Sequence, residues 1–150
     1  IEKLWGLEPE EAMRKRAEPK LKDMPCEFEF LGLKGEDIPL EDKSVDTVLS
    51  TFTMCTIPEV MVALEQMKRV LKPGGVMVFS EHGKAPDAAV EKWQSRINPT
   101  WNKLAGGCNL NREIDRLVTD AGFEFVELNH DYVPGPKIAS YMYWGVAKAR

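Results

Sequence analysis

Residues 69–80 read Arg-Val-Leu-Lys-Pro-Gly-Gly-Val-Met-Val-Phe-Ser, which is the end of a helix, a turn and a buried strand in succession. The positions before and into this stretch have apolar residues at helical spacing: Val60, Leu64, Met67 and Leu71. A helix is therefore expected from Glu59 to the Pro-Gly-Gly turn. The run at 76–80 is apolar up to its final serine, which is typical of a strand in a buried parallel sheet. A helix followed by such a strand predicts an α/β fold.

The rest of the chain continues this alternation. We expect further strands at residues 1–8, 26–31, 44–50, 123–129 and 141–149, and further helices at 10–18, 86–97 and 111–121. Proline is expected to end two of these helices, at Pro19 and at Asn98-Pro99, and Gly122 is expected to end another. The last two strands have no helix between them, so they should pair antiparallel. The order predicts one domain built on a layered, mostly parallel sheet.

Composition narrows the class of protein. The chain has 150 residues, 43% of them hydrophobic and 29% charged, which is ordinary for one globular domain and excludes a disordered chain. No apolar run approaches the roughly 18 residues of a membrane span. A net charge of −4 argues against nucleic acid as a partner. The cysteines Cys26, Cys55 and Cys108 are too few and too scattered for a disulfide framework or a metal site, so we expect no metal and a cytoplasmic location.

In open α/β sheets, ligands bind outside the carboxyl ends of the strands, and this rule selects the candidate site residues. Glu8 ends the first strand, where an acid can accept both hydroxyls of a ribose. It can equally be an acid that favours the start of the next helix through the helix dipole. Gly35 and Glu36 follow the second strand, where a glycine lets the backbone approach a planar ring, although a solvated turn explains them as well.

Three threonines and a cysteine alternate with apolar residues just after the strand at 44–50, in Thr51-Phe-Thr-Met-Cys-Thr56. Thr53 and Cys55 would then line a cleft, unless the strand simply continues and half-buries them. His82 follows the most apolar strand and could act as a general base near neutral pH, although a lone histidine is more often a hydrogen-bonded structural group.

The remaining candidates lie in the last two helices and in the connection between them. Trp93 and Trp101 are expected in a core rather than a site, because large aromatic side chains are usually buried. Cys108 has only Arg112 as a neighbouring basic residue, so an activated nucleophile is not expected. Asn111, or Asn109, can cap the following helix.

Two segments, Pro39-Leu-Glu-Asp-Lys-Ser-Val-Asp46-Thr-Val48 and Arg69-Val-Leu-Lys-Pro-Gly-Gly75 with the strand after it, resemble the class I S-adenosylmethionine-dependent methyltransferases. The resemblance is to the methyltransferase type 11, or ubiquinone/menaquinone methyltransferase-like, group. Other segments look like the branch of that group that includes thiol methyltransferases: Thr53-Met-Cys-Thr-Ile-Pro58, Glu81-His-Gly83, Trp93-Gln94, Pro99-Thr-Trp101 and Gly106-Gly-Cys-Asn-Leu-Asn-Arg112. Together they cover essentially all 150 residues.

The resemblance implies a three-layer, Rossmann-like sheet of seven strands, mostly parallel with an antiparallel last strand. It implies S-adenosyl-L-methionine as cofactor, with Glu8 on the ribose, Gly35 and Glu36 beside the adenine and Thr53 beside the methionine portion. His82 would be the catalytic residue. The other residues facing the methyl acceptor would be Cys55, Trp93, Trp101, Cys108, Asn111 and Arg112.

The chain departs from the family pattern in two places. Many relatives have an aspartate two residues before the position of Glu36, where this chain has Lys34. The first strand of the family and its Gly-x-Gly-x-Gly loop are expected ahead of Ile1, so residues 1–150 are expected to be the C-terminal portion of a methyltransferase domain. Two neighbouring strands would then be unpaired and an apolar surface left open.

The implied reaction is an in-line methyl transfer from a sulfonium to a small-molecule thiol, hydroxyl or carbon acceptor, for which the protein mainly supplies orientation and desolvation. A thiolate needs little help from a base, whereas a hydroxyl or carbon acid needs one, and His82 is the candidate. The alternative is an inactive fragment or scaffold that has lost cofactor binding and associates, for example as a homodimer, through its exposed sheet. The sequence does not identify the acceptor.

Overall fold

The computed structural model describes residues 1–32 and 34–150, and within them the strands and helices alternate as the sequence predicts. The elements are β1 (Lys3–Gly6), α1 (Glu11–Leu21), β2 (Glu27–Phe30), β3 (Val45–Thr51), α2 (Val60–Val70), β4 (Leu71–His82), α3 (Ala88–Leu104), α4 (Ile114–Asp120), β5 (Phe123–Tyr132), the 3-10 helix η1 (Lys137–Ala139) and β6 (Tyr141–Ala149). The α/β class is confirmed. No helix in the described ranges is both long and apolar enough to cross a membrane.

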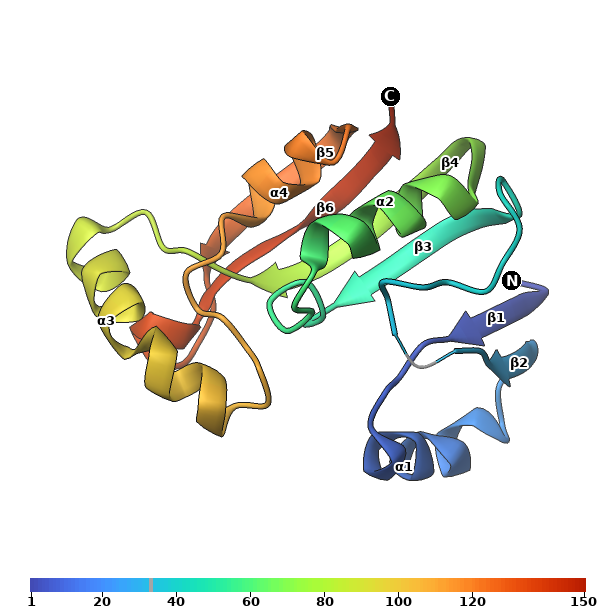
Figure 1. The fold of residues 1–150 in the computed structure, drawn as a ribbon, viewed down its shortest axis with the longest axis horizontal. Coiled ribbons are helices and arrows are strands. Elements are labelled where there is room, and N and C mark those ends of the chain that lie inside the picture. Colours follow the sequence, from blue (N-terminus) through green and yellow to red (C-terminus); the bar gives the residue numbers. More distant parts are fainter. Residues whose placement is uncertain (33) are drawn as a thin grey trace.

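The strands of the described residues form two sheets (Figure 1). β1 pairs with β2 in parallel, and the larger sheet has the order β3-β4-β6-β5. β3 and β4 are parallel, whereas β6 is antiparallel to both of its neighbours, β4 and β5. The expected antiparallel last strand is therefore confirmed. In place of the single seven-stranded sheet that the resemblance implied, the described residues form six strands in these two sheets, and α1 lies beside the smaller one (Figure 1).

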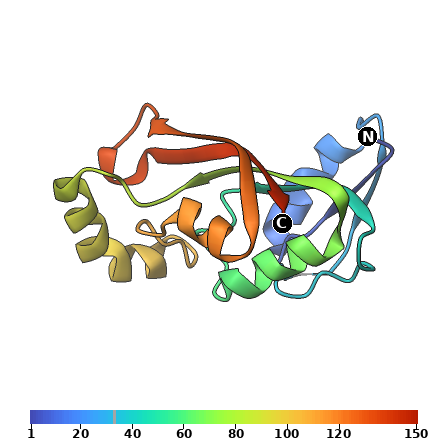
Figure 2. The same cartoon turned by 90° about the horizontal axis from the view of Figure 1, so that it is seen from above.

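The core lies between the larger sheet and the helices α2 and α4, which cover the same face of it (Figure 2). α2 is amphipathic, and its inward residues include Leu64, which has no exposed surface. Met77 and Phe79 alternate along β4 and are buried against this layer. A fully buried side chain of this size stabilises the fold by about 1.5–3 kcal/mol. This packing therefore holds the larger sheet against α2 and α4.

The sequence predicted that the helix runs up to the turn Pro73-Gly74-Gly75. In the structure α2 ends earlier, at Val70, and β4 begins at Leu71 and contains the turn residues. Val45 of β3 pairs with Leu71, but Thr47 already pairs with Val76, so the extra residues are absorbed by an irregularity in the pairing. Gly74 adopts a φ of 84°, which glycine tolerates because it has no Cβ.

The prediction that proline ends two helices is also wrong, because Pro19 lies inside α1 and Pro99 inside α3. Pro19 is in the last turn of its helix, where few backbone bonds remain to be lost. Next to Pro99, a tertiary hydrogen bond holds the helix: Asn98 Oδ1 accepts the backbone N–H of Leu110 at 2.8 Å. α4 begins at Ile114 rather than near residue 111, and it ends before Gly122 as expected.

Candidate functional site

Two cysteines and a histidine from three separate segments meet at the carboxyl ends of β3 and β4. Cys55 lies in the turn after β3, His82 is the last residue of β4, and Cys108 lies in the loop between α3 and α4. The Cys108 Sγ and His82 Nε2 atoms are 3.0 Å apart, and one ligand atom of each of the three residues lies within 4.8 Å of the others. We call these residues the Cys-His-Cys cluster. The cysteines are too scattered along the chain to predict a disulfide framework or a metal site, but the fold brings Cys55 and Cys108 together, because the loop that contains Cys108 lies at the edge where β3 and β4 end.

Burial keeps Cys55 and His82 uncharged at neutral pH. Loss of solvent raises the pKa of the Cys55 thiol to about 12, and the thiol is also 3.3 Å from the Thr56 hydroxyl. Burial lowers the pKa of His82, so its imidazole is neutral at pH 7. Cys108 was expected to have only Arg112 as a basic neighbour, but the fold places the His82 ring beside it.

The loop that contains Cys108 is fastened to the turn that contains Cys55. The Trp101 indole N–H donates to Cys108 Sγ at 3.3 Å. Asn109 donates to the Cys55 carbonyl from its backbone at 2.8 Å and from its side-chain amide at 3.0 Å. Arg112 donates to the carbonyls of Met54 and, at 2.7 Å, Ile57. Asn109 was expected only as a possible helix cap; its actual partner is a carbonyl from a distant turn.

Glu81 is the buried acid that organises the end of β3, and sequence reasoning gave it no role. It has no exposed surface. It accepts the Ser50 hydroxyl at 2.8 Å and the backbone N–H of Thr53 at 3.0 and 2.9 Å on its two oxygens. Burial raises the pKa of its carboxyl group, and these hydrogen bonds oppose that rise. A carboxylate directly after an apolar strand was the available signal, since buried acids require partners.

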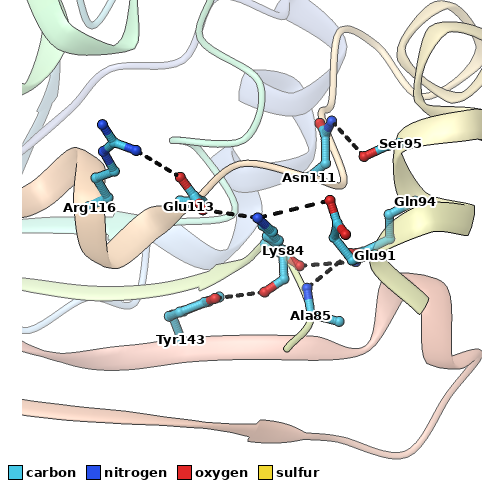
Figure 3. A network of polar contacts seen from close by, with 10 residues as sticks. Lys84, Ala85, Glu91, Gln94, Ser95, Asn111, Glu113, Arg116 and Tyr143 are labelled. Carbon is cyan, nitrogen blue, oxygen red and sulfur yellow. Dashed lines mark hydrogen bonds and ion pairs between the residues drawn. The ribbon is translucent and has the colours of Figure 1, made fainter. Parts of the chain in front are cut away.

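Trp93 and Gln94 are neighbours on α3. Trp93 was expected in the core but is exposed, whereas Gln94 is buried. Trp93 is 57% exposed with the Arg96 guanidinium 5.5 Å from its ring centroid, and no hydrogen bond in the described part of the chain joins it to the cluster. Gln94 is buried and accepts the Ala85 N–H at 2.9 Å (Figure 3). It also donates to the carbonyls of Gly83 and Ile138 at 3.1 and 3.0 Å, so it joins α3 to two other segments. Gln94 therefore positions the loop that follows His82.

Asn111 lies in a polar groove of about 430 Å³ rather than in the cluster. Its amide is 3.5 Å from the Ser95 hydroxyl, and Lys84 lies across the groove, paired with Glu113 at 3.0 Å (Figure 3). Arg112 also lines this groove, so the loop from 109 to 112 separates it from the Cys55 turn.

The residues expected to hold a cofactor follow the strands as predicted. Glu8 comes after β1, and its Oε1 accepts the Glu10 N–H at 2.9 Å at the start of α1, so a helix-start role is present. Gly35 lies where an added Cβ would be 3.0 Å from Ile57 Cδ1, so the turn that contains Glu36 packs tightly on the segment after β3. Thr53 is held there by Glu81. Glu8 can accept hydroxyl groups, Gly35 has no side chain to block a ring, and Thr53 is fixed by Glu81. These features suit a cofactor that contains a nucleoside.

Comparison with known families identifies the family to which this chain belongs. Residues 2–79 match the family model described as Methyltransferase domain. The chain belongs to this methyltransferase family. The sequence motifs indicated the same family, the class I S-adenosylmethionine-dependent methyltransferases, and the cofactor of that class is S-adenosyl-L-methionine.

Known relatives of this methyltransferase include thiol S-methyltransferases. The chain is 35% identical to thiol S-methyltransferase TMT1B of Rattus norvegicus over 109 residues, which are 71% of this chain and 44% of that protein. It is 35% identical to TMT1A of Homo sapiens over 107 residues, 70% of this chain and 44% of that one. The chain therefore matches less than half the length of these relatives.

The fold is shared with solved methyltransferase structures. A SAM-dependent methyltransferase from Methanosarcina mazei superimposes with a TM-score of 0.75, covering 98% of this chain and 82% of that one. The two sequences are 15% identical, so the likeness concerns the fold. It confirms the Rossmann-like class expected for this methyltransferase.

Proposed function

We propose that this methyltransferase transfers the methyl group of S-adenosyl-L-methionine to a small-molecule thiol at the Cys-His-Cys cluster. The observation that carries the proposal is the position of the cluster: it lies at the carboxyl ends of β3 and β4, beside the Thr53 turn. Ligands of open α/β sheets bind at this edge. The similarity to thiol S-methyltransferases favours a thiol over a hydroxyl or carbon acceptor.

The cofactor would be held along the same edge of the strands. We assign Glu8 to the ribose, Gly35 and Glu36 to the adenine and Thr53 to the methionine portion. Support comes from the buried Glu81, whose two oxygens accept the Thr53 N–H and fix that turn at the end of β3. A fixed turn suits a reaction in which the protein mainly orients the activated methyl group.

The acceptor would enter beside the cluster, framed by Trp101, Cys108 and Arg112. Its thiol loses a proton, the resulting sulfur forms a bond to the methyl carbon, and the bond from that carbon to the sulfonium breaks. S-adenosylhomocysteine and a methyl thioether leave. We assign His82 to assisting the loss of the proton, because its imidazole is neutral and lies in the cluster.

The remaining partner assignments follow from the same chemistry. Trp93 and Asn111 stay candidates for the acceptor end, although their own contacts are with Arg96 and Ser95. The three cysteines are free thiols, which fits a reducing compartment such as the cytoplasm. The acidic net charge supports a small molecule rather than nucleic acid as the second ligand. Association of two copies through the sheet stays a prediction.

Calorimetry and product analysis test this function. S-adenosylhomocysteine titrated into the purified protein should release or absorb heat, and S-adenosylmethionine with ethanethiol should yield ethyl methyl sulfide by mass spectrometry. Ethanol is the matched acceptor without a thiol. No heat would favour the inactive scaffold, whose self-association sedimentation would detect. Methylation of ethanol in preference to ethanethiol would overturn the choice of acceptor.

A pH profile of two histidine variants tests the role of His82. His82→Ala should lower transfer to ethanethiol by about 10²-fold at pH 7, where the thiol must lose a proton, and by much less near pH 10. His130→Ala is the matched control, since His130 lies on β5 and bonds the Tyr141 hydroxyl at 2.7 Å. Equal effects of the two substitutions would contradict the assignment.

A further inference from the structure

We propose that Cys55, His82 and Cys108 bind a zinc ion through three protein ligands, with the fourth coordination position open to the sulfur of the acceptor. The metal site stands on the geometry of the cluster alone. The role of the fourth position rests on the proposed function.

The distances within the cluster are close to those of a zinc site. Tetrahedral zinc with sulfur bonds of about 2.3 Å and nitrogen bonds of about 2.0 Å separates its ligand atoms by roughly 3.5–3.8 Å. Here Cys108 Sγ and His82 Nε2 are 3.0 Å apart, and the ligand atoms of all three residues lie within 4.8 Å of one another. Side-chain shifts of about an ångström would therefore bring all three to one centre.

The types of ligand select the metal. Two thiols and an imidazole are soft and borderline donors, which suit zinc and do not suit magnesium or calcium. A site with three protein ligands and one free position is the arrangement of catalytic rather than structural zinc. His82 is only partly buried, whereas both cysteines are buried, so the free position can be reached from the His82 side.

Groups around the ligands are placed as a second layer. The Trp101 indole N–H points at Cys108 Sγ from 3.3 Å, and the Thr56 hydroxyl is 3.3 Å from Cys55 Sγ. Donors of this kind stabilise metal-bound thiolates and fix their orientation.

A zinc ion also balances charge at this place. Two thiolates and one Zn²⁺ sum to zero, so a buried complex avoids the cost of burying unpaired charge. A free thiol has a pKa near about 8.5 and is mostly protonated at neutral pH, whereas a thiol bound to zinc is deprotonated. The acceptor would release its proton to water on binding the metal, so His82 would assist this loss as a ligand of the zinc and not as a free base, and the acceptor sulfur would then attack the methyl carbon. The thioether product carries no charge and is a weaker ligand, so it can leave.

Cobalt substitution tests the metal site without any cofactor. The purified protein, kept reduced and freed of metal, is titrated with Co²⁺, and bound thiolates should produce near-ultraviolet charge-transfer absorption that one equivalent of Zn²⁺ abolishes. Cys55→Ser and Cys108→Ser should each lose about half of that absorption and bind zinc more than about tenfold more weakly. Cys26→Ser is the matched control, because Cys26 lies just before β2 and outside the cluster, and it should change neither result.

Several results would overturn the site. These are an absence of charge-transfer absorption in the unsubstituted protein, absorption in Cys55→Ser and Cys108→Ser as strong as in the unsubstituted protein, or a Cys55–Cys108 disulfide found by peptide mass mapping under reducing conditions. If the serine variants fail to fold, Trp101→Phe removes only the N–H donor to Cys108, and it should still weaken zinc binding about tenfold.

The role of the fourth position has its own measurement. Ethanethiol should shift the cobalt absorption, and no shift would overturn that role while leaving the metal site in place. Zinc binding without methyl transfer would reject the proposed function and not the site. Methyl transfer by protein that binds no metal would do the reverse.

Discussion

Replacing Gln94 with methionine should cost this protein much of its stability, although the new side chain has nearly the same length and flexibility. Gln94 is the buried residue of α3, and its amide joins that helix to the loop after β4 and to η1. Gln94→Met keeps the packing and removes three hydrogen bonds. The N–H of Ala85 and the carbonyls of Gly83 and Ile138 would lose their partner.

The magnitude follows from the burial of those partners. Leaving a buried backbone group unsatisfied costs about 1–3 kcal/mol. Ala85 and Gly83 are buried, whereas Ile138 is half-buried and its carbonyl can bond water instead. The N–H of Ala85 and the carbonyl of Gly83 would therefore stay unsatisfied. We expect the free energy of unfolding to fall by about 3–5 kcal/mol. With a urea slope of about 2 kcal/mol per molar, the midpoint should drop by about 2 M.

Urea unfolding followed by circular dichroism measures this, with Gln66→Met as the matched control. Gln66 is also a helical glutamine, but among the described residues its side chain bonds only Arg69, which keeps the carbonyls of Ile38 and Leu40 and the Asp42 carboxylate. The control should lose less than about 1 kcal/mol. A midpoint shift in Gln94→Met no larger than in Gln66→Met would refute the view that this amide holds α3 in place.

Three further outcomes are expected. Leu64→Ala should lower the free energy of unfolding by about 2–5 kcal/mol in the same urea assay, because Leu64 is fully buried under the sheet, and a smaller loss would contradict the core described above. The hydrogen bond from Lys84 lowers the pKa of Glu113, so the stability that this pair contributes is present above the ordinary glutamate pKa and is lost as the pH falls. The loss of unfolding free energy between roughly pH 5 and 3 should therefore be shallower in Glu113→Gln than in the unsubstituted protein. Parallel curves of stability against pH would count against the pair. In metal-free protein at pH 8, iodoacetamide should modify Cys26 before Cys55, because burial raises the pKa of Cys55 to about 12, and peptide mass spectrometry would reveal the opposite order if this is wrong.

Local patterns decided the order of elements and the family. The spacing of Val60, Leu64 and Met67 predicts the buried face of α2, and Gly122 marks the end of α4 with a φ of 83°. Such features depend on a few neighbouring residues, so they are legible without the fold. The same reasoning failed at Pro99, where bonds from residues in a later loop keep the helix intact.

The candidate site was legible only in part. His82 and Thr53 could be placed at strand ends, since apolar strands are visible in the sequence and ligands bind where they end. The partners of these residues could not be inferred. Glu81 bonds a turn 28 residues away, and Gln94 bonds a carbonyl 44 residues away, and neither separation follows from any local pattern.

By itself, the sequence determined the α/β class, the methyltransferase family and its cofactor, because these depend on short motifs and on periodicity. Only the tertiary structure decided that Cys55, His82 and Cys108 form one cluster. Counted along the chain they are isolated residues with no ligand spacing. They meet because β3 and β4 run parallel and end at the same edge, where Asn109 and Arg112 then fasten the distant loop that contains Cys108.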